Sequence, residues 1–313
     1  MKKKLLSIVL CVAMVTIMIS GCGQKESMNN QVQSEETSNQ DEATEESNDV
    51  ASSGSQSAKD KRYAIVIRSA GNPYAEKEMG GFVDAIEEYG AEYVTKAPDA
   101  ATAEAQITMI NELVAQKIDA IAIAANDLDA LQPAIEAAKA EGIKVISVDG
   151  QLNAASRLTH INQADSEMIG RTLIQATSEM IGATGQIAIL SATSQSSNQN
   201  VWIEYMEKEL EEGDYSNIEL VKIAYGDDEF QKSVDEAEAL IKNYPDLKAI
   251  VAPTTVGIMA AAKVVTDKDL IGKVAVTGLG LPSEMAEYIN NGSCPWMYLW
   301  NPIDVGYLAG YAS

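Results

Sequence analysis

From residue 61 onward, short apolar runs of strand length alternate with longer segments that have helical periodicity. Near-continuous apolar runs are typical of strands buried on both faces, and their alternation with helices predicts parallel sheets covered by helices on both sides. One such helical segment, 103–117, places Ile107, Ile110, Leu113 and Val114 on one face. The strand-like runs are 64–67, 91–95, 120–125, 145–148, 158–162, 186–190, 218–223, 249–252, 274–279 and 297–300.

The apolar run 145–148 is followed by Asp149-Gly150, and Asp149 is the central candidate for a site residue. In open α/β sheets, ligands bind beyond the carboxyl ends of the strands. A carboxylate there can accept hydrogen bonds from the hydroxyls of a small polar ligand. Asp-Gly is also a turn dipeptide, so Asp149 can equally serve as a turn cap. The polar residues that end several other strands favour the ligand-binding interpretation.

The folded part, residues 61–313, is long for one core and fits two lobes. The alternation weakens after Gly150, and we place the first lobe boundary after Ser156. A second crossing is predicted near Cys294-Pro295-Trp296. The predicted fold class is therefore α/β, with two Rossmann-like lobes built on parallel sheets and joined by a hinge. Residues 61–156 and 298–313 form the N-terminal lobe and residues 157–297 the C-terminal lobe, with a cleft between them.

The first 60 residues have a different composition. Lys2, Lys3 and Lys4 precede an apolar stretch, 5–19, that is too short for a confident membrane span and has the pattern of a secretion signal. Ile19-Ser20-Gly21-Cys22 resembles the lipobox of bacterial lipoproteins. That resemblance implies removal of residues 1–21 and lipidation of Cys22; an ordinary secretory signal with an incidental cysteine is the alternative. Residues 22–60, rich in Ser, Glu, Asn and Gln, are expected to form a disordered tether.

Charge and motif content narrow the function classes. The chain has 46 Asp+Glu against 23 Lys+Arg, a formal charge of −23, which argues against nucleic acid as a partner. We find no nucleophile elbow, P-loop, zinc-protease motif or complete dinucleotide fingerprint, and so no cofactor, metal or enzyme activity is predicted. His160 is interpreted as a packed histidine, and Cys294 as a small buried residue. The acidic triplet 227–229 fits a solvated helix N-terminus better than a metal or acid–base site.

These features together resemble the substrate-binding proteins of sugar ABC importers, of the ribose-binding type within the type I periplasmic binding proteins. Asn72-Pro73-Tyr74 resembles that family's Asn-Pro-aromatic signature. More specific stretches resemble the rhamnose-binding subgroup, which is close to receptors for the quorum signal autoinducer-2. They are 124–131 (AANDLDAL), 190–193 with 198–202 (LSAT and NQNVW), 245–258 (PDLKAIVAPTTVGI), 278–285 (GLGLPSEM) and 299–307 (LWNPIDVGY).

The resemblance also implies ligand-binding residues. Autoinducer-2 receptors use a lysine after the first strand, an aspartate after the fourth, an Asp-Gln pair and a Pro-x-Ala segment. The corresponding residues here are Arg68, Asp149, Asn198-Gln199, and Pro253 with Thr255. Asp149, Gln199 and Pro253 match, whereas Asn198 and Thr255 agree with the rhamnose-type pattern. The family's usual carboxylate after the ninth strand is replaced by Gly280, which argues against pentoses and aldohexoses as the ligand.

A deoxyhexose offers hydroxyls, one methyl group and an apolar ring face. Asp149 would accept from hydroxyls, Arg68 would donate to oxygens and balance the buried carboxylate, and Asn198 and Gln199 can do both. Tyr74 or Trp300 would cover the apolar face. A polar loop is the alternative role for Asn198 and Gln199, and hinge packing is the alternative for Trp300.

The first hypothesis is therefore a lipid-anchored, extracytoplasmic, monomeric protein that binds a rhamnose-type sugar and delivers it to ABC permease subunits. The second is an autoinducer-2 receptor for import or signalling, and the third, an extracytoplasmic enzyme on the same fold, lacks a catalytic constellation. Related proteins continue past the helix that begins near Ile303, so the sequence is expected to be a fragment that ends early; a protein without its last hinge segment is the alternative.

Overall fold

The computed structural model describes residues 57–313. The predicted signal segment, the lipidation at Cys22 and nearly all of the tether lie outside the described residues. Within the described range, no helix combines the length and the apolar composition needed to cross a membrane.

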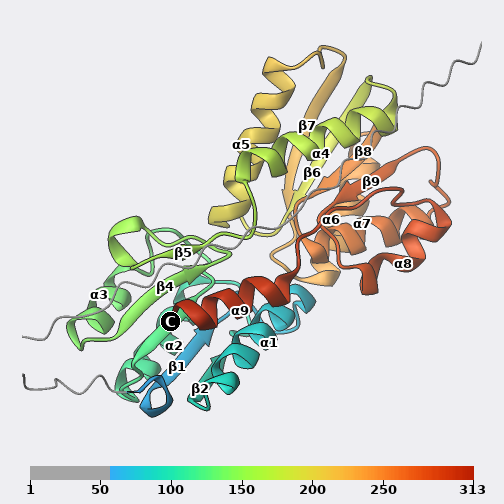
Figure 1. The fold of residues 1–313 in the computed structure, drawn as a ribbon. Helices are drawn as coiled ribbons and strands as arrows, with labels where there is room; N and C mark the ends of the chain where they lie inside the picture. Colours follow the sequence, from blue (N-terminus) through green and yellow to red (C-terminus); the bar gives the residue numbers. More distant parts are fainter. Residues whose placement is uncertain (1–56) are drawn as a thin grey trace, which may run out of the picture. The chain divides into compact units, whose positions relative to one another are not determined.

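The first half of the described chain builds a five-stranded parallel sheet with the order β2-β1-β3-β4-β5 (Figure 1). We call this sheet and the helices on it the first lobe. Its elements are η1 (Ala58–Asp60), β1 (Arg62–Val66), α1 (Pro73–Glu88), β2 (Glu92–Lys96), α2 (Ala103–Ala115), β3 (Ala120–Ile123), α3 (Gln132–Ala140), β4 (Lys144–Val148), η2 (Ala154–Ser156) and β5 (His160–Ile161).

The second half builds a four-stranded parallel sheet with the order β7-β6-β8-β9, and we call it and helices α4 to α8 the second lobe. The last helix, α9, returns to the first lobe. The elements are α4 (Ser166–Ile181), β6 (Gly185–Ser191), α5 (Ser197–Glu212), β7 (Ile218–Tyr225), α6 (Phe230–Asn243), β8 (Leu247–Ala252), α7 (Thr255–Asp267), β9 (Ala275–Gly278), α8 (Pro282–Asn291) and α9 (Pro302–Ala312).

Alternate residues of each strand belong to different cores, as two-sided burial requires. In β1, Ala64 and Val66 pack with α2 and α3, whereas Ile65 packs with α1 and α9. In the second lobe, β6 and β8 contribute to one core with α6, α7 and α8, and to another with α4 and α5. The predicted fold class, two parallel-sheet α/β lobes, is therefore the one observed.

The structure differs from the sequence expectation in the lobe boundary and in the last predicted strand. The run 158–162 contains β5, which pairs with β4 through Ser147–His160 and Val148–Ile161. This segment therefore extends the first sheet past residue 156, where the sequence analysis places the lobe boundary. The run 297–300 forms no strand among the described residues, because it makes a single bridge, Tyr298 to Leu279, before the chain crosses to the first lobe.

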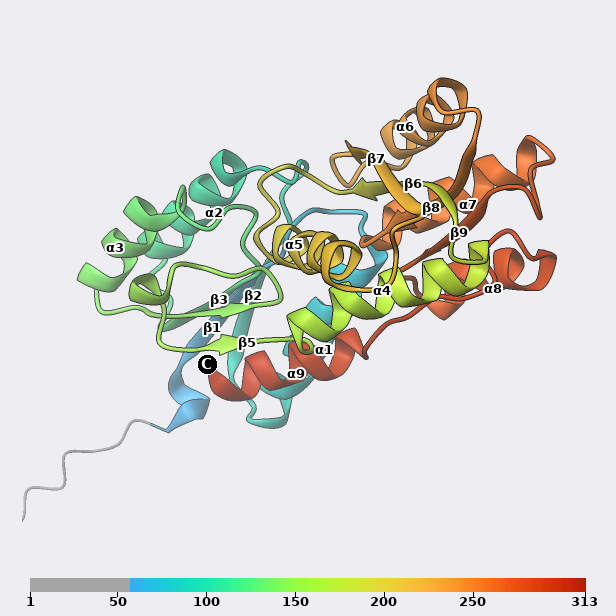
Figure 2. The ribbon, with the colours of Figure 1, turned by 90° about the horizontal axis from the view of Figure 1, so that it is seen from above.

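Helices α1 and α9 lie side by side against the first sheet in both views of the ribbon (Figures 1 and 2). Both helices begin with the same N-cap arrangement. The side-chain oxygen of Asn72 caps α1 and that of Asn301 caps α9, and a proline follows each asparagine at the first helical position. The helices then approach backbone to backbone. A Cβ atom at Gly81 would overlap the Ile303 carbonyl, and one at Gly306 would overlap the carbonyl of Glu78.

We expect Gly306→Ala to destabilise the protein, because the new methyl group must push α9 away from α1. Overpacking of this kind typically costs about 1–3 kcal/mol, which for a chain of this size lowers Tm by several degrees. The matched control is Gly80→Ala on α1, where a Cβ would meet no atom within 4 Å other than the backbone of its own helix and its chain neighbours. That exposed helical position should gain about 0.5–1 kcal/mol. Thermal unfolding followed by circular dichroism measures both, and equal Tm changes would contradict the close packing.

Candidate ligand-binding site

A pocket lies at the carboxyl ends of the strands and is walled by both lobes. It contains about 350 Å³ of empty space, part of it open to solvent. The nine residues that the sequence analysis assigns to ligand binding all line it: Arg68, Asn72, Tyr74, Asp149, Asn198, Gln199, Pro253, Thr255 and Trp300. Five further wall residues are absent from that assignment: Trp202, Asp228, Thr254, Leu279 and Leu299.

Asp149 follows β4 with a left-handed backbone, φ 50°, a conformation that costs energy for a residue with a side chain. The following residue, Gly150, has no room for a Cβ beside the backbone of Ala125. Within residues 57–313 the Asp149 carboxylate accepts from side chains alone. One oxygen receives the Tyr74 hydroxyl at 3.4 Å and the other the Asn198 amide at 3.0 Å. The carboxylate therefore faces the pocket and does not cap the turn.

Arg68 follows β1 and is only 4% exposed. Its Nη1 donates to Asn198 Oδ1 at 3.2 Å and its Nη2 donates to Ser196 Oγ at 2.6 Å. Arg68 is expected to balance the Asp149 carboxylate, and its charge opposes the rise in the pKa of Asp149, although no direct ion pair joins the two in the described structure. The Asn198 amide lies between them and hydrogen-bonds to both.

Asn198 and Gln199 occupy the first turn of α5 and are both buried. Asn198, from the second lobe, hydrogen-bonds to Arg68 and Asp149, which both belong to the first lobe, so its amide joins the two lobes. Gln199 Oε1 accepts from Ser191 Oγ at 2.6 Å and from the Ala192 backbone at 2.9 Å. These bonds fix the Gln199 side chain on the pocket wall and leave its amide N–H groups as donors.

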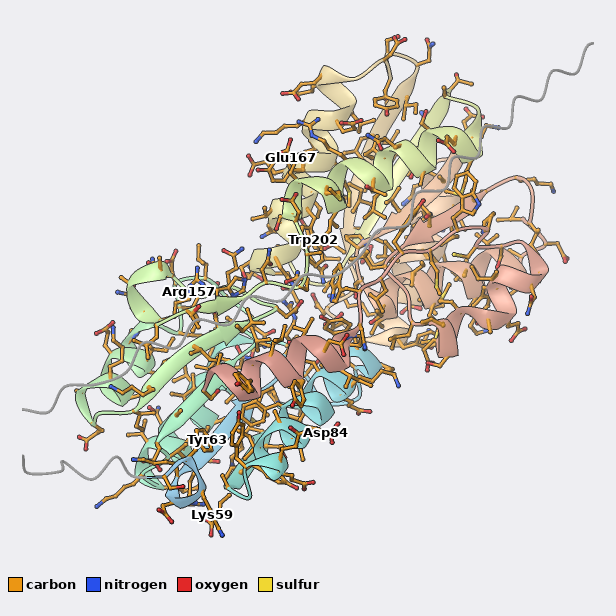
Figure 3. The ribbon with its side chains drawn as sticks, viewed as in Figure 1. Lys59, Tyr63, Asp84, Arg157, Glu167 and Trp202 are labelled. Carbon is orange, nitrogen blue, oxygen red and sulfur yellow. The ribbon has the colours of Figure 1, made fainter. Side chains whose placement is uncertain are left out.

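Aromatic side chains form one side of the pocket. Trp300 Nε1 donates to the Tyr74 hydroxyl at 2.7 Å, and the two rings meet edge to face. Trp202 packs against Trp300 with ring centroids 5.6 Å apart, in the region where the two lobes meet (Figure 3). Burial and the nearby Asp149 raise the pKa of Tyr74 well above its usual value, so its hydroxyl stays protonated and can donate to the carboxylate.

Trp202 could have been found from the sequence. It lies four residues after Asn198 on the same helix, and residues at that spacing share a helix face. It belongs to the rhamnose-type motif NQNVW, but the motif alone predicts no role for its side chain.

Asp228 is the second wall residue that the sequence analysis missed. The acidic triplet 227–229 does lie at the start of a helix: Glu229 caps α6, and Asp227 pairs with Lys232. Asp228 instead accepts from Asn72 Nδ2 at 3.2 Å and from Thr254 Oγ1 at 2.9 Å. No sequence pattern separates it from its two neighbours, because its partners Asn72 and Thr254 come from distant parts of the chain.

The remaining chemically notable residues lie away from the pocket. His160 Nδ1 is hydrogen-bonded to Ser147 Oγ at 2.8 Å, as expected for a packed histidine. Cys294 is buried, and burial raises its thiol pKa to about 12. Residues 57–313 contain no cluster of three or more metal-ligating side chains.

The pocket thus combines carboxylate acceptors, amide groups, a guanidinium and aromatic faces. Burial raises the pKa of Asp149, while the charge of Arg68 and the hydrogen bonds from Tyr74 and Asn198 oppose that shift. Such a set suits a small neutral ligand with several hydroxyls and an apolar face.

Comparison with known proteins identifies relatives of the whole described chain. A structure of an ABC transporter solute-binding protein from Clostridium phytofermentas with bound L-rhamnose is 51% identical with a TM-score of 0.80, covering 81% of this chain and 80% of that one. A sugar ABC transporter protein from Actinomyces odontolyticus is 39% identical with a TM-score of 0.63, and the match covers 82% of this chain and 83% of that one.

The structure of LsrB from Clostridium saccharobutylicum in complex with AI-2 is 21% identical with a TM-score of 0.76, covering 80% of each chain. This last similarity shows the fold alone. The family model for the periplasmic binding protein domain matches residues 63–313, and the chain therefore belongs to the periplasmic binding protein domain family.

Proposed function

We propose that this protein is the solute-binding component of a sugar ABC importer and that its ligand is L-rhamnose or a closely related deoxyhexose. The observation that carries the proposal is the 51% identity, over four fifths of both chains, to a solute-binding protein with bound L-rhamnose. The pocket supports it, because the residues that agree with the rhamnose-type pattern, Asn198 and Thr255, both lie on its wall.

In this proposal Asp149 accepts from ligand hydroxyls and Gln199 donates to ligand oxygens. Charge-assisted hydrogen bonds contribute about 1.5–3 kcal/mol each. The faces of Trp300 and Trp202 cover the apolar side of the sugar, including its methyl group. A few such bonds can support micromolar affinity, about −8 kcal/mol, after the costs of association.

The lobes are proposed to close around the ligand by hinge motion. Side chains already join them in the described structure. Arg68 and Asp149 of the first lobe bond to residues at the start of α5, and Asn72 donates to Asp228. Ser197 Oγ also bonds to the backbone of Gln151, accepting from its N–H at 3.0 Å. A ligand that completes these contacts would stabilise the closed arrangement.

Location and partners follow from the same proposal. The family is one of extracytoplasmic binding proteins, and its ABC transporter members work with permease subunits. The lipobox-like Ile19-Ser20-Gly21-Cys22 supports anchoring of a monomer to the membrane through lipid on Cys22, with residues 22–60 as a spacer. Family members are binding proteins, so we assign a binding and not a catalytic role.

The first test is calorimetry of the purified protein against L-rhamnose, other sugars and autoinducer-2. We expect L-rhamnose to bind and Asp149→Asn to weaken it at least ~100-fold, since removal of one partner of a buried charge pair costs about 3–5 kcal/mol. The control Asp84→Asn changes an exposed carboxylate on α1 (Figure 3) and should bind normally. Tight binding of autoinducer-2 with no response to L-rhamnose would replace this proposal with the receptor hypothesis.

Asn198→Asp tests the amide that joins Arg68 to Asp149. The new carboxylate would face Asp149 where Asn198 now donates, and the repulsion should weaken L-rhamnose binding ~10-fold or more. The control Asn200→Asp makes the same change two residues further along α5, where the side chain bonds only to the Ser194 carbonyl. Equal affinities for the two variants in the same calorimetric assay would argue against a role for Asn198 in the site.

Cys22→Ala tests the anchor. Expressed in a lipoprotein-processing bacterium, this variant should leave the membrane fraction without change in Tm, because the substitution lies far along the chain from the folded lobes. Fractionation and immunoblotting measure the distribution. A variant that still sediments with membranes would contradict lipidation at this residue.

A further inference from the structure

Glu78 lies on the buried face of α1 and has no exposed surface. It is one turn after Tyr74 and one turn before Phe82, so the helix directs it into the core with these two side chains. Neither carboxyl oxygen has a hydrogen-bond partner within residues 57–313. A buried polar group without a partner is rare in folded proteins and requires an explanation.

The surroundings of Glu78 contain more carboxyl groups than cations. Asp149 and Arg68 are the charged groups that influence it most. Of the two carboxyls, Asp149 has two hydrogen-bond donors and is linked through Asn198 to the guanidinium of Arg68. Glu78 has none of these stabilising contacts in the described chain. One guanidinium can therefore balance one carboxylate, and the hydrogen bonds select Asp149.

The packing of α9 closes Glu78 off from water. The Gly306 backbone lies directly against the main chain of Glu78, with no space for a methyl group between them. Burial and the charge of Asp149 raise the pKa of Glu78 well above its usual value, and Arg68 opposes this shift. A raised pKa is the shift known for carboxylic acids in apolar sites, and such acids stay protonated at about pH 7.

Other ionisable groups on α1 and on the elements packed against it are directed to other partners or to solvent. Four of them are bonded to glutamates: Tyr307 to Glu88, Tyr93 to Glu87, Lys96 to Glu112 and Arg62 to Glu92. Tyr311 contacts the Tyr89 ring, Tyr63 bonds to the Ala58 carbonyl, and His160 bonds to Ser147. The remaining charged side chains are exposed: Glu76, Lys77, Asp84, Lys144 and Asp304.

We propose that Glu78 is a protonated positioning residue, which holds a buried proton behind the pocket and so leaves Asp149 as the one anion paired with the charge of Arg68. The role of Asp149 as the acceptor for the sugar rests on the proposed function, whereas the proton on Glu78 does not. The uncharged acid contributes no negative charge that would repel Asp149 or draw Arg68 away from α5.

The sign of the pH dependence follows from the raised pKa. In the unfolded chain Glu78 loses its proton near pH ~4.3. Above that value the folded protein binds one proton more than the unfolded chain, so this group's contribution to stability falls as pH rises, until Glu78 ionises in the folded state. Above that range, where Glu78 begins to ionise in the free folded protein, ligand binding excludes water from the neighbouring pocket and favours the neutral acid, so binding should take up protons there.

The first experiment needs no ligand. The infrared spectrum of the wild-type protein at about neutral pH should contain a protonated carboxylic acid C=O band that is absent from Glu78→Gln and retained in Glu76→Gln. Glu76 is the matched control, an exposed glutamate two residues earlier on α1. Wild-type stability to denaturant should decline with rising pH relative to Glu78→Gln. A wild-type spectrum without the acid band overturns the proposal even if Glu78→Gln fails to fold.

The second experiment measures L-rhamnose affinity by calorimetry in buffers of different ionisation enthalpy. Between about pH 6 and about pH 9 the wild-type Kd should rise ~10-fold with proton uptake on binding, and that of Glu78→Gln by less than ~2-fold. Identical pH profiles for the two proteins would refute the positioning role. If neither protein binds L-rhamnose, the proposed function fails, and the infrared band still decides the state of Glu78.

Discussion

The Asp149–Asn198–Arg68 contact is the interaction on which the pocket depends. Asp149 and Arg68 extend from the ends of two strands of the first lobe, and Asn198 comes from the first turn of α5 in the second. Two buried charges of opposite sign are thus joined through a neutral amide that belongs to the other lobe. Because an uncompensated buried charge is costly, the contact between the lobes and the charge balance of the site depend on each other.

The rest of the fold holds these three residues in place. Parallel strands bring Arg68 and Asp149 to the same edge of the first sheet, and the left-handed backbone at Asp149 turns its carboxylate toward the pocket. Trp300 lies in the crossing segment just before α9 and joins the aromatic wall. The glycine contact of α9 with α1 fixes the helix at whose start Asn72 lies and which carries Tyr74 and Glu78. The chain crossing before α9 therefore contributes to the site as well as to the connection between lobes.

Much of this arrangement could be predicted from the sequence. Strand runs ending in polar residues indicated the edge of the sheet, and the family-like motifs identified nine residues that the fold brings to one pocket. The Asn198 amide that joins Arg68 to Asp149 could not be predicted, because its place depends on rotamers and it lies 130 residues from Arg68 in the sequence. Asp228 was missed because its neighbours Asp227 and Glu229 satisfy the helix-start pattern equally well. Glu78 was missed because one polar residue in an apolar stripe barely changes the helical pattern.

These two missed carboxyls have different environments, and the difference suits a neutral ligand. Asp228 receives hydrogen bonds from Asn72 and Thr254, so its charge is stabilised by donors from both lobes. Glu78 has no donor in the described structure, and a proton removes its charge instead. With Glu78 neutral, Arg68 balances Asp149, and the ligand does not need to bring a charge of its own into the closed pocket. A sugar provides hydroxyls to these acceptors without upsetting that balance, whereas a charged solute would leave an unpaired charge in the buried site.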